Sequence, residues 1–131
     1  SDSVVAGLEK MTEMKSVALN GKLLVLGRTE AGVDLLVRSG LGESGSWEQH
    51  STALPADVDL PTLRMNRNRL YLTSKQGQLY TSEDGLAWET LGAPQEGLSL
   101  VAVTEQFYYA LMNGKLYRSA DAAEWLEEGL D

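Results

Sequence analysis

The chain has 131 residues, of which 43% are apolar and 23% charged, a balance that favours one globular domain over a disordered chain. Its formal net charge of −8 argues against nucleic acids and anionic membranes as partners, because both need a basic footprint. There are no cysteines and one histidine, His50, which we interpret as a surface residue. We therefore expect no metal site, no cofactor and, since every apolar run is short, no membrane insertion.

Residues 1–13 show no clear periodicity and are predicted to form a linker or edge segment. From residue 14 onward, short leucine-rich and β-branched stretches alternate with turn residues, which predicts one all-β domain over residues 14–131. The dipeptide Asn20-Gly21 is a strong hairpin signal, because both turn positions must accept a positive φ. The first four strands are expected at 15–19, 22–28, 33–39 and 47–51.

The same four-strand pattern then returns twice. A linker that contains Pro55 and Pro61 precedes the second copy, and a second linker at 92–97 precedes the third. The second copy is expected to have strands at 62–66, 69–74, 78–82 and 88–91. The third is expected to have strands at 98–104, 107–112, 115–119 and 125–128. We therefore predict three four-stranded antiparallel meanders at about 14–52, 62–91 and 98–128.

A short loop also recurs. Ser82, Asp84, Gly85 and Trp88 mark it in the second meander, and Ser119, Asp121 and Trp125 mark it in the third. A fainter copy runs from Val37-Arg38-Ser39 to Ser46-Trp47, and by this alignment Arg38 and Arg118 hold the same position in two repeats. The tryptophans lie roughly 40 residues apart, the period of a four-stranded propeller blade.

This loop resembles the Asp box of sialidase-type, BNR-repeat propellers, whose pattern is Ser/Thr-x-Asp-x-Gly-x-Thr-Trp. It departs from that pattern because the interval from Ser82 to Trp88 is one residue short and Gly85 follows Asp84 directly. The resemblance implies β-propeller blades over residues 14–131. The chain is also similar to the propeller portion of surface or periplasmic proteins of gut bacteria, which implies a place in the cell envelope. The sequence itself does not determine the compartment.

The residue types of the loop are explained by structure alone. An Asp side chain accepts hydrogen bonds from backbone N–H groups two residues on, a Gly supplies a positive φ, and the indole covers the hairpin. We therefore interpret the loop residues as structural and assign no catalytic residue. The chain is expected not to be an enzyme.

One cluster of basic residues stands out in this acidic chain. Arg64, Arg67 and Arg69 lie close together, and Arg64 falls on an expected innermost strand, where it is the arginine best placed to face a central channel. With Tyr108 they form a candidate patch for an acidic sugar or a protein partner; the alternative is a hairpin decorated with charge. The favoured function is a non-catalytic binding or scaffold module, and the alternative is a fragment of a degenerate sialidase-like, glycan-processing enzyme.

Three blades cannot close a ring, because propellers usually have four to eight. The expected partners are therefore further blades of a longer chain, or a second copy that closes a six-bladed ring.

Overall fold

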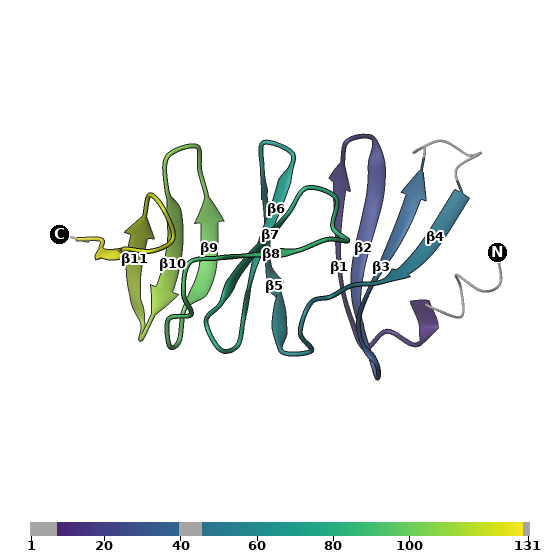
Figure 1. Ribbon diagram of the computed structural model, residues 1–131, viewed down its shortest axis with the longest axis horizontal. Helices are drawn as coiled ribbons and strands as arrows, with labels where there is room; N and C mark the ends of the chain where they lie inside the picture. The colour runs from purple at the N-terminus through teal and green to yellow at the C-terminus, as the bar shows by residue number, and fades with distance from the viewer. Residues whose placement is uncertain (1–7, 40–45, 130–131) are drawn as a thin grey trace.

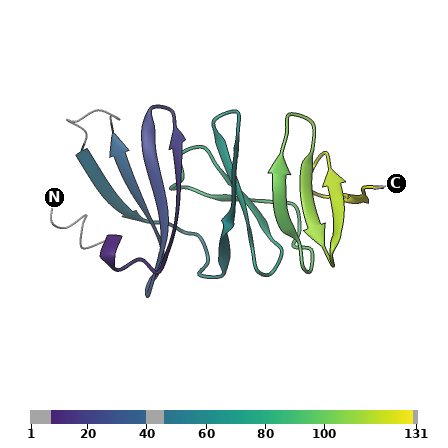
Figure 2. The same cartoon turned by 180° about the vertical axis from the view of Figure 1, so that it is seen from behind.

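The computed structural model describes residues 8–39 and 46–129, and they form three four-stranded antiparallel sheets (Figures 1 and 2). Blade 1 consists of β1 (Glu13–Leu19), β2 (Lys22–Thr29), β3 (Gly32–Ser39) and β4 (Ser46–Ser51). Blade 2 consists of β5 (Val58–Asn66), β6 (Arg69–Ser74), β7 (Leu79–Ser82) and β8 (Glu89–Leu91). Blade 3 consists of β9 (Ser99–Val103), β10 (Tyr108–Met112), β11 (Lys115–Ser119) and β12 (Leu126–Glu127). The prediction of an all-β fold with three meanders is confirmed.

Within each blade the strands are hydrogen-bonded in chain order. The first strands meet at the middle of the molecule, where β5 contacts both β1 and β9. Blades 1 and 3 extend from there to opposite ends, with blade 2 between them (Figure 1). No helix among the described residues is long and apolar enough to cross a membrane.

Tight turns join the strands where the sequence places turn residues. Asn20 and Gly21 have φ values of 52° and 74°, and Asn113 and Gly114 have 53° and 77°. The two-residue turn between β5 and β6 also has positive φ at both positions, although it contains no glycine. Paired positive φ values are typical of type I′ hairpins, whose twist matches that of the strands.

The core lies between the blades rather than within one sheet. We call the face of a blade that points to the next blade along the chain its forward face, and the opposite one its rear face. The cluster between blades 1 and 2 contains Leu24, Leu26 and Leu35 from one side and Leu70 and Leu72 from the other. The cluster between blades 2 and 3 is smaller, and its buried members are Tyr71, Leu79, Leu100 and Ala122.

The rear face of blade 1 is covered by the chain's own N-terminal segment. Leu8, at a short turn of helix, and Met11 pack against Val25, Leu36 and Trp47. Met11 is only 8% exposed, and its side chain occupies the space where a Cβ on Gly27 would lie.

The predicted start of blade 2 was wrong. The linker was expected to run to Pro61, but β5 begins at Val58 and carries Pro61 inside a register shift between Asp59 and Arg64. Proline fits there because β5 is an edge strand and the bulge needs no backbone N–H donor at that position. The Thr62 hydroxyl accepts a hydrogen bond from the Thr73 N–H at 2.9 Å, so this N–H has a partner where the ladder between β5 and β6 is interrupted. The other strand ends match the predicted ones or differ from them by one or two residues.

The predicted equivalence of Arg38 and Arg118 was also wrong. Arg38 lies opposite Leu23 in blade 1, as Ser82 lies opposite Leu70 in blade 2. Leu23 and Leu70 are both the second residue after the first hairpin turn of their blades, so Arg38, rather than Ser39, corresponds to Ser82. Since neighbouring strand residues point to opposite faces, Arg38 lies on a rear face and Arg118 on a forward face.

Candidate functional site

Two serine–aspartate loops, residues 82–88 in blade 2 and 119–125 in blade 3, are built by the same set of hydrogen bonds. In the first, the Ser82 hydroxyl donates to Asp84 Oδ1 at 3.2 Å and accepts the N–H of Gly85 at 2.7 Å. Asp84 Oδ1 then accepts the N–H groups of Leu86 and Ala87 at 2.9 and 3.0 Å. The Ser82 hydroxyl and one oxygen of the Asp84 carboxylate therefore hold the turn together.

The second loop repeats these bonds almost atom for atom. Ser119 donates to Asp121 Oδ1 at 3.1 Å and accepts the N–H of Ala122 at 2.8 Å. Asp121 Oδ1 accepts the N–H groups of Ala123 and Glu124 at 2.9 and 3.0 Å. The fainter copy in blade 1 lies in part at residues 40–45, outside the described residues.

These bonds shift the acidity of both aspartates. Burial acts to raise the pKa of Asp84, but the N–H groups of Ala87 and Leu86 and the Ser82 hydroxyl outweigh it, and the pKa is lowered. The pKa of Asp121 is lowered chiefly by the N–H groups of Glu124 and Ala123. A carboxyl group that is kept ionised in this way is unsuited to act as a general acid near neutral pH.

The arginines of the candidate patch have partners inside the protein. Arg64 donates to the Val101 carbonyl at 2.6 Å and to the Pro61 and Leu63 carbonyls at 2.9 Å. Its side chain therefore joins β5 of blade 2 to β9 of blade 3. Arg64 is the first residue of β5 after the register shift that contains Pro61.

Arg67 and Arg69 point to the rim of the molecule at the end that carries the serine–aspartate loops. Arg67 forms an ion pair with Glu105 of blade 3 at 3.1 Å, and Arg69 forms one with Glu83 at 2.9 Å. Arg69 also donates to the Thr81 hydroxyl at 2.8 Å. Each positive charge is thus balanced, so the patch offers hydrogen-bond donors rather than a net positive field.

A hollow of about 300 Å³ opens beside these two arginines, between blades 2 and 3. We call it the tyrosine hollow; its lining includes Arg67, Arg69, Tyr71, Glu105, Gln106 and Tyr108. The rings of Tyr71 and Tyr108 meet edge to face, with centroids 5.7 Å apart. Burial, and then the contact with Tyr71, raises the pKa of Tyr108. The structure therefore brings three of the four predicted patch residues together and leaves out Arg64.

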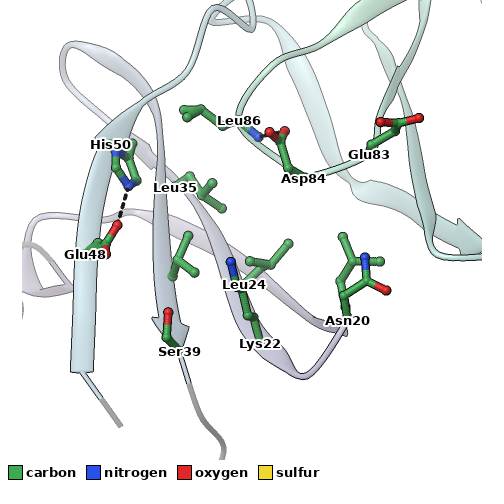
Figure 3. A pocket seen from close by; sticks show the side chains of 12 residues that line it. Asn20, Lys22, Leu24, Leu35, Ser39, Glu48, His50, Glu83, Asp84 and Leu86 are labelled. Carbon is green, nitrogen blue, oxygen red and sulfur yellow. Dashed lines mark hydrogen bonds and ion pairs between the residues drawn. The ribbon is translucent and has the colours of Figure 1, made fainter.

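A second hollow, of about 230 Å³, lies between blades 1 and 2 (Figure 3). We call it the histidine hollow. Its floor includes Leu24 and Leu35, Leu86 lies above them, and Glu48 and His50 stand at one side on β4. His50 Nε2 is hydrogen-bonded to Glu48 Oε2 at 3.1 Å. Sequence reasoning missed this site, although the spacing of Glu48 and His50 on a strand places both on one face.

A model of the DUF6242 beta propeller domain matches residues 2–128. The chain belongs to the DUF6242 beta propeller family. No curated protein and no solved structure matches it.

In the described part of the DUF6242 propeller, the histidine hollow does not bring Ser39 and His50 together as a nucleophile and its base. Ser39 lines the histidine hollow, but strand register places His50 opposite Leu35, four residues from Ser39 and about 13 Å along the strand. His50 is in any case bonded to Glu48. Among the described residues no three His, Cys, Asp or Glu side chains gather as metal ligands would.

Proposed function

We propose that this DUF6242 propeller portion is a non-catalytic binding module, that its serine–aspartate loops are Asp boxes, and that the tyrosine hollow receives a glycan. The observation that carries the proposal is the composition of that hollow. It combines aromatic rings with arginine, amide and carboxylate groups at the meeting point of two blades.

Sugars present hydroxyl groups that both donate and accept hydrogen bonds, together with C–H faces that pack on flat rings. Arg67 and Gln106 supply donors, Glu105 supplies acceptors, and Tyr108 supplies an aromatic ring. The aromatic pair and the two ion pairs fix these groups before a ligand arrives. Fixed groups lower the entropic cost of binding.

The alternative, a degenerate sialidase-like enzyme fragment, requires arginines that converge on a carboxylate and an activated tyrosine. Arg64 is bonded to backbone carbonyls, and Arg67 and Arg69 are bonded to glutamates. The pKa of Tyr108 is raised rather than lowered, which weakens it as a nucleophile. These contacts favour binding without turnover.

The test is glycan binding by matched variants. Arg67→Ala and Gln106→Ala remove side chains from the tyrosine hollow, whereas Lys75→Ala and Gln76→Ala remove one cation and one glutamine at exposed positions in the turn at the opposite end of blade 2. Binding on a glycan array, followed by calorimetry with the best hit, should weaken about tenfold for the first pair only. Loss with both pairs, or no binding at all, refutes the site, and cleavage of a fluorogenic sialoside would support the enzyme instead.

A further inference from the structure

The histidine hollow has an apolar floor on the forward face of blade 1. Leu24 lies opposite Val37 in the strand pairing, and Leu35, two residues before Val37 on β3, points to the same side of the sheet. Leu19 adds to this floor from β1. Leu86, from the serine–aspartate loop of blade 2, lies above it (Figure 3). The apolar part of a ligand in this hollow would therefore lie between the two blades.

The size and the rim of the hollow narrow the class of ligand. Its volume is about 230 Å³, whereas pockets for drug-sized ligands measure about 300–1,000 Å³. Side chains of both charges line it, namely those of Lys22, Glu48, Glu83 and Asp84. A ligand of this hollow is therefore small, and charged groups as well as apolar contact select it.

Lys22 is a cation without the acidic partner that its counterpart in blade 2 has. Lys22 and Arg69 are each the first strand residue after the first hairpin turn of their blades. Arg69 forms an ion pair with Glu83 at 2.9 Å, whereas Lys22 lies opposite Ser39. Within the described part of the chain, no carboxylate forms an ion pair with Lys22. Its ammonium group is therefore available to an anionic group of a ligand.

Asp84 is the carboxylate of the hollow that remains for a cation. Glu48 is hydrogen-bonded to His50, and Glu83 is paired with Arg69. The three loop hydrogen bonds to the Asp84 carboxylate all end on Oδ1, so Oδ2 has no partner among the described residues. Figure 3 shows Asp84 at the edge of the hollow, on the loop of blade 2.

We propose that the histidine hollow binds a free aliphatic amino acid, whose carboxylate pairs with Lys22, whose ammonium group pairs with Asp84 Oδ2, and whose side chain lies on the leucine floor. An amine alone would use only Asp84, and a carboxylate alone would use only Lys22. An amino acid carries both charged groups beside an apolar group in one small molecule. This site goes beyond the glycan site of the tyrosine hollow and does not depend on it.

The probe is L-leucine, titrated into the chain in a calorimeter. Isoamylamine is leucine without its carboxylate, isocaproate is leucine without its ammonium group, and glycine lacks the apolar side chain. Each should bind about tenfold more weakly than leucine or worse, because each loses one of the three contacts. The absence of saturable leucine binding overturns the proposal, as does isoamylamine, isocaproate or glycine that binds as tightly as leucine.

Two variants assign the charged groups. Lys22→Gln should weaken leucine binding about tenfold and leave the affinity for isoamylamine unchanged. Asp84→Asn should weaken leucine binding about tenfold and should not weaken the binding of isocaproate. Thermal unfolding checks that both variants fold. A variant that weakens all these ligands equally contradicts the role given to its residue and overturns the proposal.

A matched control is present in blade 3. Lys115 follows an Asn-Gly turn as Lys22 does, but it is paired with Glu127 at 3.7 Å. Lys115→Gln should leave leucine binding unchanged, and so should Arg67→Ala, which alters the tyrosine hollow. If Lys115→Gln weakens leucine binding as much as Lys22→Gln does, or if Arg67→Ala abolishes it, the ligand does not bind in the histidine hollow as proposed.

Discussion

The indole N–H of Trp88 donates a hydrogen bond to the backbone oxygen of Gly85 at 2.7 Å. Trp125 holds the same place in the next blade, yet its indole nitrogen is buried and has no hydrogen-bond partner. The two loops otherwise share their bonds. The residue at the Gly85 position is Ala122 in blade 3, with φ of 64° instead of 83°.

This difference predicts unequal effects of the same substitution. Trp88→Phe removes a hydrogen bond and leaves the Gly85 carbonyl unpaired, whereas Trp125→Phe removes a donor that is already unpaired. We expect Trp88→Phe to lower the free energy of unfolding by about 1 kcal/mol more than Trp125→Phe does. Urea unfolding of both variants measures the difference, and equal losses would contradict the role given to this bond.

Gly85 should tolerate a side chain poorly. Its φ is 83°, and a Cβ there would lie 3.1 Å from Leu24 Cδ1, in the cluster between blades 1 and 2. Gly85→Ala should cost about 1–2 kcal/mol from backbone strain, with a further loss from crowding. Gly114→Ala is the matched control, since φ there is 77° but a Cβ would meet nothing within 4 Å. Thermal denaturation that ranks Gly114→Ala as the more damaging change would rule out this account.

The serine–aspartate loops should make stability depend on acid pH. The pKa values of Asp84 and Asp121 are both lowered in the folded protein. Their stabilising contribution is therefore complete above the unfolded value of about 3.9 and is lost as pH falls through the lower folded values. Asparagine keeps an oxygen acceptor but does not titrate, so Asp84→Asn/Asp121→Asn should flatten the dependence of unfolding free energy on pH below about 4.

A double variant at exposed Glu30 and Glu96, each changed to Gln, serves as the control for lost charge. It should retain most of the acid dependence. Parallel pH profiles for the two double variants would show that the loops are not its source.

Arg64 should not be replaceable by lysine. Its Nε donates to the Val101 carbonyl and its Nη1 donates to the Pro61 and Leu63 carbonyls, a forked pattern that one ammonium group cannot reproduce. We expect Arg64→Lys to lower the free energy of unfolding by about 1–3 kcal/mol. Calorimetry provides the measurement, and Arg67→Lys, at a 69% exposed side chain, should change it by less than about 1 kcal/mol.

Local signals in the sequence were sufficient for most of the fold. Alternating apolar residues and turn dipeptides such as Asn113-Gly114 define strands and hairpins within a few neighbouring residues, and the tryptophan spacing reveals the repeat. The start of β5 was not predictable in this way. Pro61 usually ends a strand, and it is tolerated here only because β5 is an edge strand with a bulge.

The candidate site was less accessible from sequence, because it depends on contacts between blades. Proximity along the chain grouped Arg64 with Arg67 and Arg69, whereas in the structure Arg64 donates to the Val101 carbonyl of β9. The histidine hollow is lined by β2, β3 and β4 of blade 1 and by the serine–aspartate loop of blade 2. No local sequence pattern predicts that these segments lie together. The repeat alignment placed Ser39 over Ser82, one residue away from the match that the strand pairing shows. Because successive strand residues point to opposite faces of a sheet, that error put Arg38 and Arg118 on the same face.

The unequal clusters between the blades imply that the molecule does not open all at once. Blade 3 is attached through the smaller cluster, and its last strand has only two residues. Its amides should exchange with deuterium through a partial opening that leaves blades 1 and 2 folded, while the amides of β2 and β6 exchange only on global unfolding. Blade 3 would then fold last and unfold first, so its small contact with blade 2 would set its lifetime in the folded state.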